Sequence, residues 1–258
     1  MTNEFKDGSA GDADYGVIGT GYSNYRQPDP RIAELIQQAL GEVRTVVNVG
    51  AGAGSYEAGP FEFTAVEPSQ VMRDQRPGHL APAIDAKAEQ LPFEDGSFDA
   101  ALATFTVHQW SDVKAGLREL RRVARGPVVI LTCDPALVRD FWLYQYAPDV
   151  LEHEARRYPA ISTISDALGG AVAVERVPIP ADCTDGFNEA YFARPERLLD
   201  PGARQACSAW SFVEPELQEQ YLKKFRRELS SGAWDERHGA LRHQESYNGS
   251  LVLIRAIP

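Results

Sequence analysis

The first half of the chain alternates between short apolar runs and amphipathic stretches. Runs rich in Val, Ile, Ala and Phe predict buried strands at 45–49, 63–67, 82–86, 98–107 and 127–134. In 31–41 the residues Ile32, Ile36 and Leu40 recur at helical spacing, which predicts an amphipathic helix. The same spacing predicts a second helix over 111–126. Strands that alternate with helices form a parallel sheet covered on both faces, so we expect a doubly wound α/β fold.

The second half of the chain changes character. Two further runs predict strands and bring the expected total in a mostly parallel sheet to seven, at 171–180 and 250–258. The stretches 135–168 and 184–247 are helix-like and rich in aromatic residues. We therefore expect one domain over 30–258 that carries a helical cap in these two inserts. An N-terminal segment, 1–29, precedes it.

The chain is acidic. Its 258 residues include 26 Lys and Arg and 37 Asp and Glu, which gives a formal net charge of −11. Such a charge repels polyphosphate, so we expect no nucleic-acid partner. The basic runs 121–122 and 223–227 lie in helix-like stretches, and we interpret them as solvated helix faces.

Cysteine and histidine spacing narrows the class of protein further. Three widely spaced cysteines without a CxxC pair are typical of a reducing compartment and not of a zinc or iron–sulfur site. The five histidines show no metal-ligand spacing, so we expect no metal. The chain has no apolar run of about 18 residues, and its N-terminus is polar and acidic. These features predict a cytoplasmic protein without a membrane span or signal peptide.

A glycine-rich turn follows the first predicted strand. Residues 46–57 read VVNVGAGAGSYE, in which Gly50, Gly52 and Gly54 alternate directly after the apolar run. Glycine lets a chain turn tightly and lets a ligand approach its backbone. Ligands of open α/β sheets bind at the carboxyl ends of the strands, so this turn is a candidate cofactor site. Nicotinamide and flavin enzymes use G-x-G-x-x-G, whose third glycine comes one residue later.

Glu67 ends the next predicted strand, seventeen residues after Gly50. An ionised carboxylate only accepts hydrogen bonds and can bridge the two hydroxyls of a ribose. The alternative is an exposed glutamate at a strand end. The glycine turn at this distance favours the ribose role.

Two further stretches, AEQLPF at 88–93 and GSFDAA at 96–101, complete a set of motifs. Together with NVGAGAG and AVE they resemble the class I S-adenosylmethionine-dependent methyltransferases, in particular the subgroup that methylates small molecules and quinone-like acceptors. The resemblance covers roughly 30–134. It implies a Rossmann-like methyltransferase fold, S-adenosyl-L-methionine as cofactor and S-adenosyl-L-homocysteine as product.

The resemblance assigns cofactor-binding roles by position. The residues that it implies are Gly50, Ala51, Gly52 and Gly54 under the methionine part, Glu67 at the ribose, Pro68, Ser69, Ala88 and Glu89 around the adenine, and Thr104 near the sulfonium. In similar proteins an N-terminal segment folds over the cofactor, which makes Tyr22 and Arg26 candidates. The Arg26 guanidinium would suit the methionine carboxylate. The alternative is a loop that only packs on the sheet.

Two positions depart from the family pattern. Asn48 stands where the family usually has Asp or Glu, and it keeps an acceptor oxygen without the charge. Lys87 stands where the family often has an Asp that accepts a hydrogen bond from the adenine amine. Because Lys cannot accept one, we expect adenine recognition through backbone groups or another side chain.

Methyl transfer from a sulfonium is an in-line displacement, in which positioning of the acceptor supplies much of the rate. His108, just past the strand predicted at 98–107, is the candidate base, and Asp134, at the end of 127–134, also faces the crevice. Each has a structural alternative, packing or capping for His108 and capping of the next helix for Asp134. The aromatic inserts predict a mostly apolar or aromatic small-molecule acceptor, unless those rings only form the core of the cap.

The sequence therefore favours an enzyme that methylates a small molecule. One alternative is a fold relative that binds the cofactor without transferring a methyl group, which Asn48 and Lys87 keep open. The other is a nicotinamide-dependent oxidoreductase, which the glycine spacing and AEQLPF disfavour.

Overall fold

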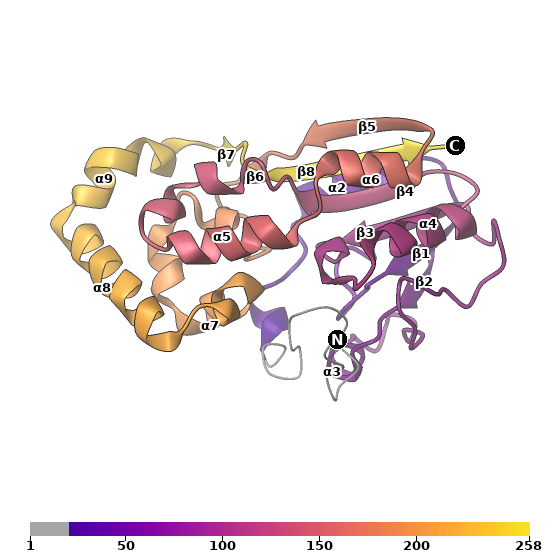
Figure 1. Cartoon of the computed structure of the whole chain (residues 1–258), viewed down its shortest axis with the longest axis horizontal. Helices are drawn as coiled ribbons and strands as arrows, with labels where there is room; N and C mark the ends of the chain where they lie inside the picture. The colour runs from indigo at the N-terminus through magenta and orange to yellow at the C-terminus, as the bar shows by residue number, and fades with distance from the viewer. Residues whose placement is uncertain (1–20) are drawn as a thin grey trace.

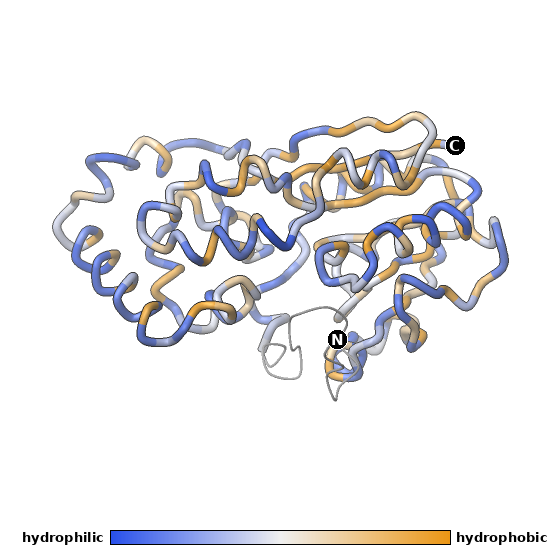
Figure 2. The backbone as a smooth tube through the Cα atoms, viewed as in Figure 1, coloured by the Kyte–Doolittle hydropathy of each residue, from blue (hydrophilic) through white to orange (hydrophobic). Residues whose placement is uncertain are grey.

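The computed structural model describes residues 21–258. Figure 1 shows an elongated molecule, with the main sheet and helices α2, α4 and α6 at one end and helices α7, α8 and α9 at the other. The apolar segments are concentrated in the strands, whereas α8 is largely hydrophilic (Figure 2). The expected doubly wound α/β fold with a helical cap is confirmed in its general architecture.

The main sheet is mostly parallel on one side and antiparallel on the other. Its strands lie in the order β2-β1-β3-β4-β8-β5. Their bounds are Thr45–Val49 for β1, Glu62–Val66 for β2, Ala100–Thr104 for β3, Val128–Cys133 for β4, Ala171–Arg176 for β5 and Leu251–Ile257 for β8. Strands β1 to β4 pair in parallel, while β8 runs antiparallel to both β4 and β5. The reversal between β1 and β3 creates the crevice at their carboxyl ends.

Seven strands were too many for this sheet: its described part has six. The stretch predicted at 82–86 makes only one parallel bridge, between Ile84 and Val66. Ile84 is 38% exposed, so the segment has no apolar surface to bury beyond β2 and does not extend as a strand. The stretch predicted at 171–180 is interrupted by Pro178, which lacks the N–H that a continuous ladder needs. It forms β5 and a two-residue strand that pairs with a second short one, β6 (Ile179–Pro180) and β7 (Ser246–Tyr247).

Helices cover both faces of the sheet because its side chains alternate between them. Helix α2 (Pro30–Leu40) buries Ile32, Ile36 and Leu40 against one face, and α4 (Val113–Val123) and α6 (Ile161–Leu168) cover the other. The α4 N-cap is Asp112, whose carboxylate accepts from the Ala115 N–H. A short helix, α3 (Gln70–Asp74), follows β2.

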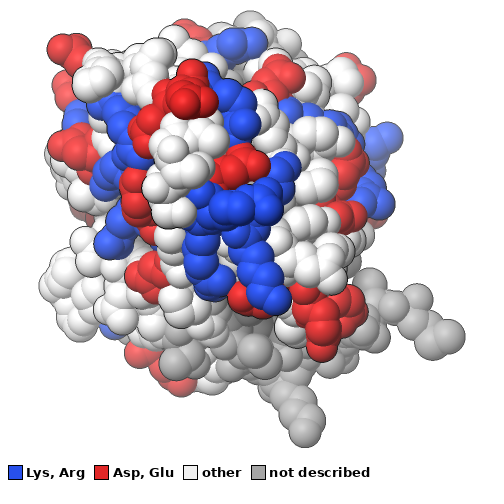
Figure 3. Space-filling model, turned by 90° about the vertical axis from the view of Figure 1, so that its left-hand side faces the viewer, with Lys and Arg blue, Asp and Glu red and all other residues white. Residues whose placement is uncertain are grey.

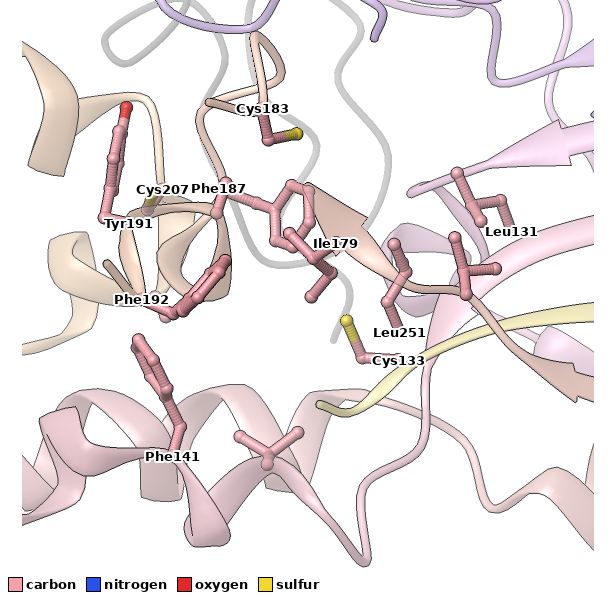
Figure 4. Close-up of a cluster of buried hydrophobic side chains, with 14 of the residues drawn as sticks. Leu131, Cys133, Phe141, Ile179, Cys183, Phe187, Tyr191, Phe192, Cys207 and Leu251 are labelled. Atoms are coloured by element: carbon pink, nitrogen blue, oxygen red, sulfur yellow. The ribbon is translucent and has the colours of Figure 1, made fainter. Parts of the chain in front are cut away.

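The cap is formed by the helices α5 (Pro148–Arg157), α7 (Pro201–Gln205), α8 (Pro215–Ser231) and α9 (Ala233–His238). Short 3-10 helices connect the elements at Tyr22–Asn24, Val107–Gln109, Val138–Asp140, Trp142–Gln145, Asn188–Tyr191, Pro195–Leu199, Ser208–Phe212 and Gly239–His243. Figure 4 shows that side chains of the sheet, such as Leu131 and Leu251, lie in one cluster with Phe187 and Phe192 of the cap. The cap and this face of the sheet therefore share a continuous hydrophobic core.

The cap end of the molecule carries the basic run of the sequence. Residues 223, 224, 226 and 227 are exposed on α8, and Arg226 pairs with Glu219 at 3.0 Å. In Figure 3 the Lys and Arg side chains gather near the centre of this face with Asp and Glu around them. Exposed pairs of this kind contribute little to stability, so the run fits a solvated helix face.

One buried carboxylate joins the cap to the sheet. Glu189, in the 3-10 helix before Phe192, is only 5% exposed, and its oxygens accept hydrogen bonds from the N–H (2.9 and 3.0 Å) and the hydroxyl (2.9 Å) of Ser250. Ser250 immediately precedes β8. Burial raises the pKa of Glu189 to about 7, although the Ser250 donors act in the opposite direction.

We predict that this burial makes stability depend on pH. The folded-state pKa lies above the unfolded value of 4.5, so the contribution of Glu189 is complete below pH 4.5 and declines as the pH rises toward 7. The unfolding free energy of the wild type relative to Glu189→Gln, measured in urea, should fall by about 3 kcal/mol across that interval. Glu175→Gln, on the exposed side of β5, is the control and should show no such trend. A pH-independent difference for Glu189→Gln would contradict the assignment.

Candidate functional site

The turn after β1 adopts a backbone that only glycine accommodates easily. Gly50 has φ 70°, and a β-carbon there would lie 1.9 Å from the Thr106 hydroxyl oxygen. Gly52 has φ 52°, and a β-carbon would lie 3.3 Å from the terminal methyl of Met72. The first glycine thus lets the turn approach the end of β3, and the second keeps the backbone open toward the crevice.

Glu67 ties this turn to the end of β2. One carboxylate oxygen accepts from the Gly52 N–H at 2.9 Å and the other from the Ser69 N–H at 2.8 Å. The side chain is nearly buried, at 8% exposure, yet it lines the cavity above the turn. A carboxylate can accept about four hydrogen bonds, which suits it to contact ribose hydroxyls from the cavity wall.

Behind the turn, a buried network supplies the negative charge that Asn48 lacks. The Asn48 amide donates to Glu57 at 3.0 Å, and Glu57 pairs with Arg76 at 2.7 Å. Glu57 and Arg76 side chains are 2% and 4% exposed, and Arg76 also reaches the Gly52 carbonyl at 3.4 Å. Asn48 therefore belongs to the support beneath the turn, and it does not reach the cavity wall.

The cavity above the turn has about 800 Å³ of empty space, counting its open mouth. The predicted site residues on its wall are Tyr22, Arg26, Gly50, Ala51, Gly52, Glu67, Pro68, Ala88 and Thr104. Most of the predicted set is thus brought together around one cavity. We call this the first cavity.

Three other predicted residues hold the surrounding elements and are not on this wall. The Ser69 hydroxyl caps α3 by accepting from the Met72 N–H at 3.3 Å. Glu89 accepts from the Ser111 hydroxyl at 2.8 Å and the Asp112 N–H at 3.0 Å, where α4 begins. The Gly54 N–H donates to the Ala51 carbonyl within the turn. Contact of these residues with a cofactor stays a prediction.

A second cavity of about 430 Å³ shares Tyr22, Arg26 and Phe105 with the first. Phe105 follows β3 with φ 52°, and Tyr56, also on the first cavity wall, has φ 63°. They are the two non-glycine residues with positive φ in the described chain. Unfavourable backbone conformations of this kind concentrate at functional sites, where the surrounding structure enforces them.

His108 lies on the wall of the second cavity. Its ring is 4.6 Å from the Tyr158 ring, centroid to centroid, and its Nδ1 atom is buried without a hydrogen-bond partner among the described residues. Burial lowers the pKa of His108 well below its usual value, and Arg157 and Arg26 lower it further. The imidazole is therefore neutral near pH 7, and the lowered pKa makes it a weaker base than a solvent-exposed histidine.

The cap contributes polar groups to this second cavity that the sequence did not single out. Glu154 accepts from the Asn188 amide at 2.8 Å, and burial raises its pKa. Arg157 donates to the Ser208 hydroxyl at 2.9 Å. These residues come from α5 and two 3-10 helices, beyond the stretch with recognisable motifs, so no local signal marks them.

A buried ion pair stands where the two cavities meet. Arg26 pairs with Asp185 through its Nε atom, and the side chains are 10% and 3% exposed. The Tyr56 hydroxyl donates to the second Asp185 oxygen at 2.8 Å, and the Arg26 guanidinium lies 4.8 Å from the Phe105 ring centroid. Asp185 lines the first cavity. No sequence motif marked Asp185, because it lies in the insert 184–247.

Asp134 lies on neither cavity wall. One carboxylate oxygen accepts from the Ala136 N–H at 3.0 Å, and its own N–H donates to the Ser250 carbonyl. This contact closes a local turn and does not cap a helix, because the next 3-10 helix, Val138–Asp140, begins after Leu137 and has no side-chain cap.

No group of three metal-ligating side chains occurs among residues 21–258. Within the same residues, no helix combines the length and apolar character needed to span a bilayer.

The buried pair beneath the turn generates a stability prediction. Glu57→Gln leaves the Arg76 charge buried without its carboxylate, which typically costs about 3–5 kcal/mol. Glu62→Gln removes the partner of Arg44 from an exposed pair and should cost less than about 1 kcal/mol. Urea denaturation of both variants measures the difference. Equal, small losses would show that the Glu57 pair does not support the turn.

Comparison with known proteins gives a consistent result. Residues 47–130 match the family described as "Methyltransferase domain". The chain is 29% identical over 184 residues to malonyl-[acyl-carrier protein] O-methyltransferase of Pseudescherichia vulneris. This alignment covers 66% of this chain and 72% of that protein. It is 40% identical over 53 residues to demethylmenaquinone methyltransferase of Mycolicibacterium gilvum, 20% of this chain and 23% of that protein. Four of the curated relatives are matched over only 23% to 37% of their length.

The likeness extends to the whole fold. A solved structure from Anabaena variabilis, described as a proposed methyltransferase of an antibiotic biosynthesis pathway, has a TM-score of 0.82 and 28% identity. The alignment covers 90% of this chain and 98% of that one, so it includes the cap as well as the sheet.

Proposed function

We propose that the chain is a class I S-adenosylmethionine-dependent methyltransferase and that it transfers a methyl group to a small-molecule acceptor held in the second cavity. The proposal rests on the observation that the two cavities share part of their wall. One cavity is built on the glycine turn and Glu67, the other contains a neutral His108, and Phe105 borders both. A methyl donor and an acceptor in these two spaces would meet in line.

The residues of the first cavity fit the cofactor. The turn at Gly50 and Gly52 would lie under the methionine part, and Glu67 would accept from the ribose hydroxyls. Pro68, Met72 and Ala88 offer apolar surface for the adenine, which does not require a side-chain acceptor at the position of Lys87. The bound cofactor supplies an activated methyl group, and the protein supplies orientation and exclusion of water.

The wall of the second cavity is more polar than apolar, so it would suit a small acceptor that combines an aromatic part with several polar groups. Phe105, Phe187 and Tyr158 provide rings, whereas Glu154 and Asn188 provide hydrogen-bonding groups. The malonyl-[acyl-carrier protein] and demethylmenaquinone relatives act, by their names, on a carboxyl compound and on a quinone-type compound. Both classes combine an apolar part with oxygen atoms.

We propose His108 as the base that removes a proton from the acceptor during transfer. Its place on the cavity wall and its buried Nδ1 atom, which has no hydrogen-bond partner among the described residues, support this role. Asp134, which holds the turn after β4, has a structural role in this proposal. The N-terminal segment 1–29 would cover the cofactor as a lid; residues 1–20 lie outside the described residues, and Tyr22 and Arg26 already line the first cavity.

Calorimetric titration with S-adenosylhomocysteine, followed by a screen for transfer of a labelled methyl group, tests the proposal. We expect micromolar binding at one site per chain and labelled product with a carboxyl-bearing or phenolic acceptor. Binding without transfer to any acceptor would favour the alternative of a cofactor-binding relative. Absence of binding would overturn the cofactor assignment.

Glu67→Ala should weaken S-adenosylhomocysteine binding by about 1.5–3 kcal/mol, since charge-assisted hydrogen bonds to the ribose are lost. Calorimetry measures the affinity, and circular dichroism checks that the turn still folds without its carboxylate. Glu62→Ala, at the exposed start of β2, is the matched control. An unchanged affinity for Glu67→Ala would refute the ribose assignment.

His108→Ala should lower turnover by about 10²- to 10⁴-fold, the usual contribution of a general base. Cofactor affinity should stay within about twofold, because His108 lines only the second cavity. His79→Ala, on an exposed loop, is the control. Full activity of His108→Ala would assign the ring a packing role against Tyr158.

A further inference from the structure

We propose that the Arg26–Asp185 ion pair is the receptor for the zwitterionic amino-acid end of the cofactor, with Asp185 binding the ammonium group and Arg26 the carboxylate. The inference rests on the proposed function of the first cavity. It assigns a cofactor role to Asp185, a cap residue outside the family match at 47–130.

The position and burial of the ion pair support this role. Arg26 and Asp185 both line the first cavity, and their side chains are 10% and 3% exposed. The Tyr56 hydroxyl donates to one Asp185 oxygen, which fixes the carboxylate. Tyr56 comes two residues after Gly54, so the pair stands beside the turn that the methionine part would occupy.

Few carboxylates are placed where they could bind the ammonium group of the cofactor. Asp185 and Glu67 are the two carboxylates on the wall of the first cavity in the described chain. Glu67 is at the end of β2, where it binds the Gly52 and Ser69 N–H groups. Asn48 has no charge. Glu57, which accepts a hydrogen bond from the Asn48 amide, is buried against Arg76 away from the cavity wall. Asp185 is therefore the carboxylate available to an ammonium group beside the turn.

The two charges of the cofactor's amino-acid end complement the two charges of the Arg26–Asp185 pair. A buried ion pair is costly to desolvate unless its remaining hydrogen-bonding capacity is used. A bound zwitterion brings one charge of each sign, so each member of the pair gains an opposite charge and the net charge of the site stays unchanged. The guanidinium presents several donors in a fixed fork, which suits a carboxylate while one donor stays on Asp185.

The assignment makes cofactor binding depend on the junction between the N-terminal segment and the cap. A bridge joins Arg26 to Asp185, and the Gly186 N–H donates to the Tyr25 carbonyl at 2.8 Å. The family-matched stretch supplies the nucleoside site, and these two outer segments supply the amino-acid site.

The test compares two ligands in calorimetry: S-adenosylhomocysteine, which has the zwitterion, and 5′-methylthioadenosine, which lacks it. Asp185→Asn should weaken S-adenosylhomocysteine by about ten- to a hundredfold and leave 5′-methylthioadenosine within about twofold. Asp182→Asn changes the exposed partner of Arg31 in the same segment and should affect neither ligand. Deaminated S-adenosylhomocysteine should bind the wild type and Asp185→Asn alike.

Equal losses for both ligands would overturn the assignment and leave Asp185 a structural role, as would an unchanged affinity for S-adenosylhomocysteine. If Asp185→Asn fails to fold, Tyr56→Phe keeps the carboxylate and removes its fixing hydrogen bond. It should then weaken S-adenosylhomocysteine selectively, and an equal effect on both ligands would again overturn the inference. A wild type that binds neither ligand would instead refute the proposed function itself.

Discussion

The geometry of the site depends on one carboxylate that holds two backbone segments together. Glu67 accepts from N–H groups that follow β1 and β2, so the ends of these two strands cannot separate without leaving a nearly buried charge poorly solvated. The glycine turn is then free to approach β3 closely. A ligand that adds hydrogen bonds to the same carboxylate meets a group already fixed in place, which reduces the ordering cost of binding.

The segments outside the sheet contribute charged side chains to the two cavities, whereas the strand ends contribute mainly backbone groups. Around the first cavity, the strand ends contribute glycines and small residues, whereas Arg26 and Asp185 come from segments far apart in the sequence. Around the second, the sheet contributes His108 and the cap contributes Glu154 and Arg157. In the proposed function, the sheet would bind the nucleoside part of the cofactor and the cap would select the acceptor.

The features that could be predicted are those marked by sequence patterns over a few neighbouring residues. The β1 strand matched its predicted bounds, and the turn, Glu67 and Ala88 were placed on one wall, because strand periodicity and glycine spacing act over a few residues. Asp185 was missed because its role arises from a contact 159 residues away. The predicted strand at 82–86 failed because burial, which periodicity cannot report, decides whether an edge segment joins a sheet.

The sheet order has a consequence for how the chain assembles during synthesis. Strand β8, at 251–257, lies between β4 and β5, so β5 has no partner in the main sheet until the last strand has left the ribosome. The parallel strands β1 to β4 and the glycine turn can associate earlier, since all their residues precede 134. Vectorial folding would therefore leave β4 as an exposed apolar edge while residues 134–250 are synthesised, a period in which chaperone binding is most useful.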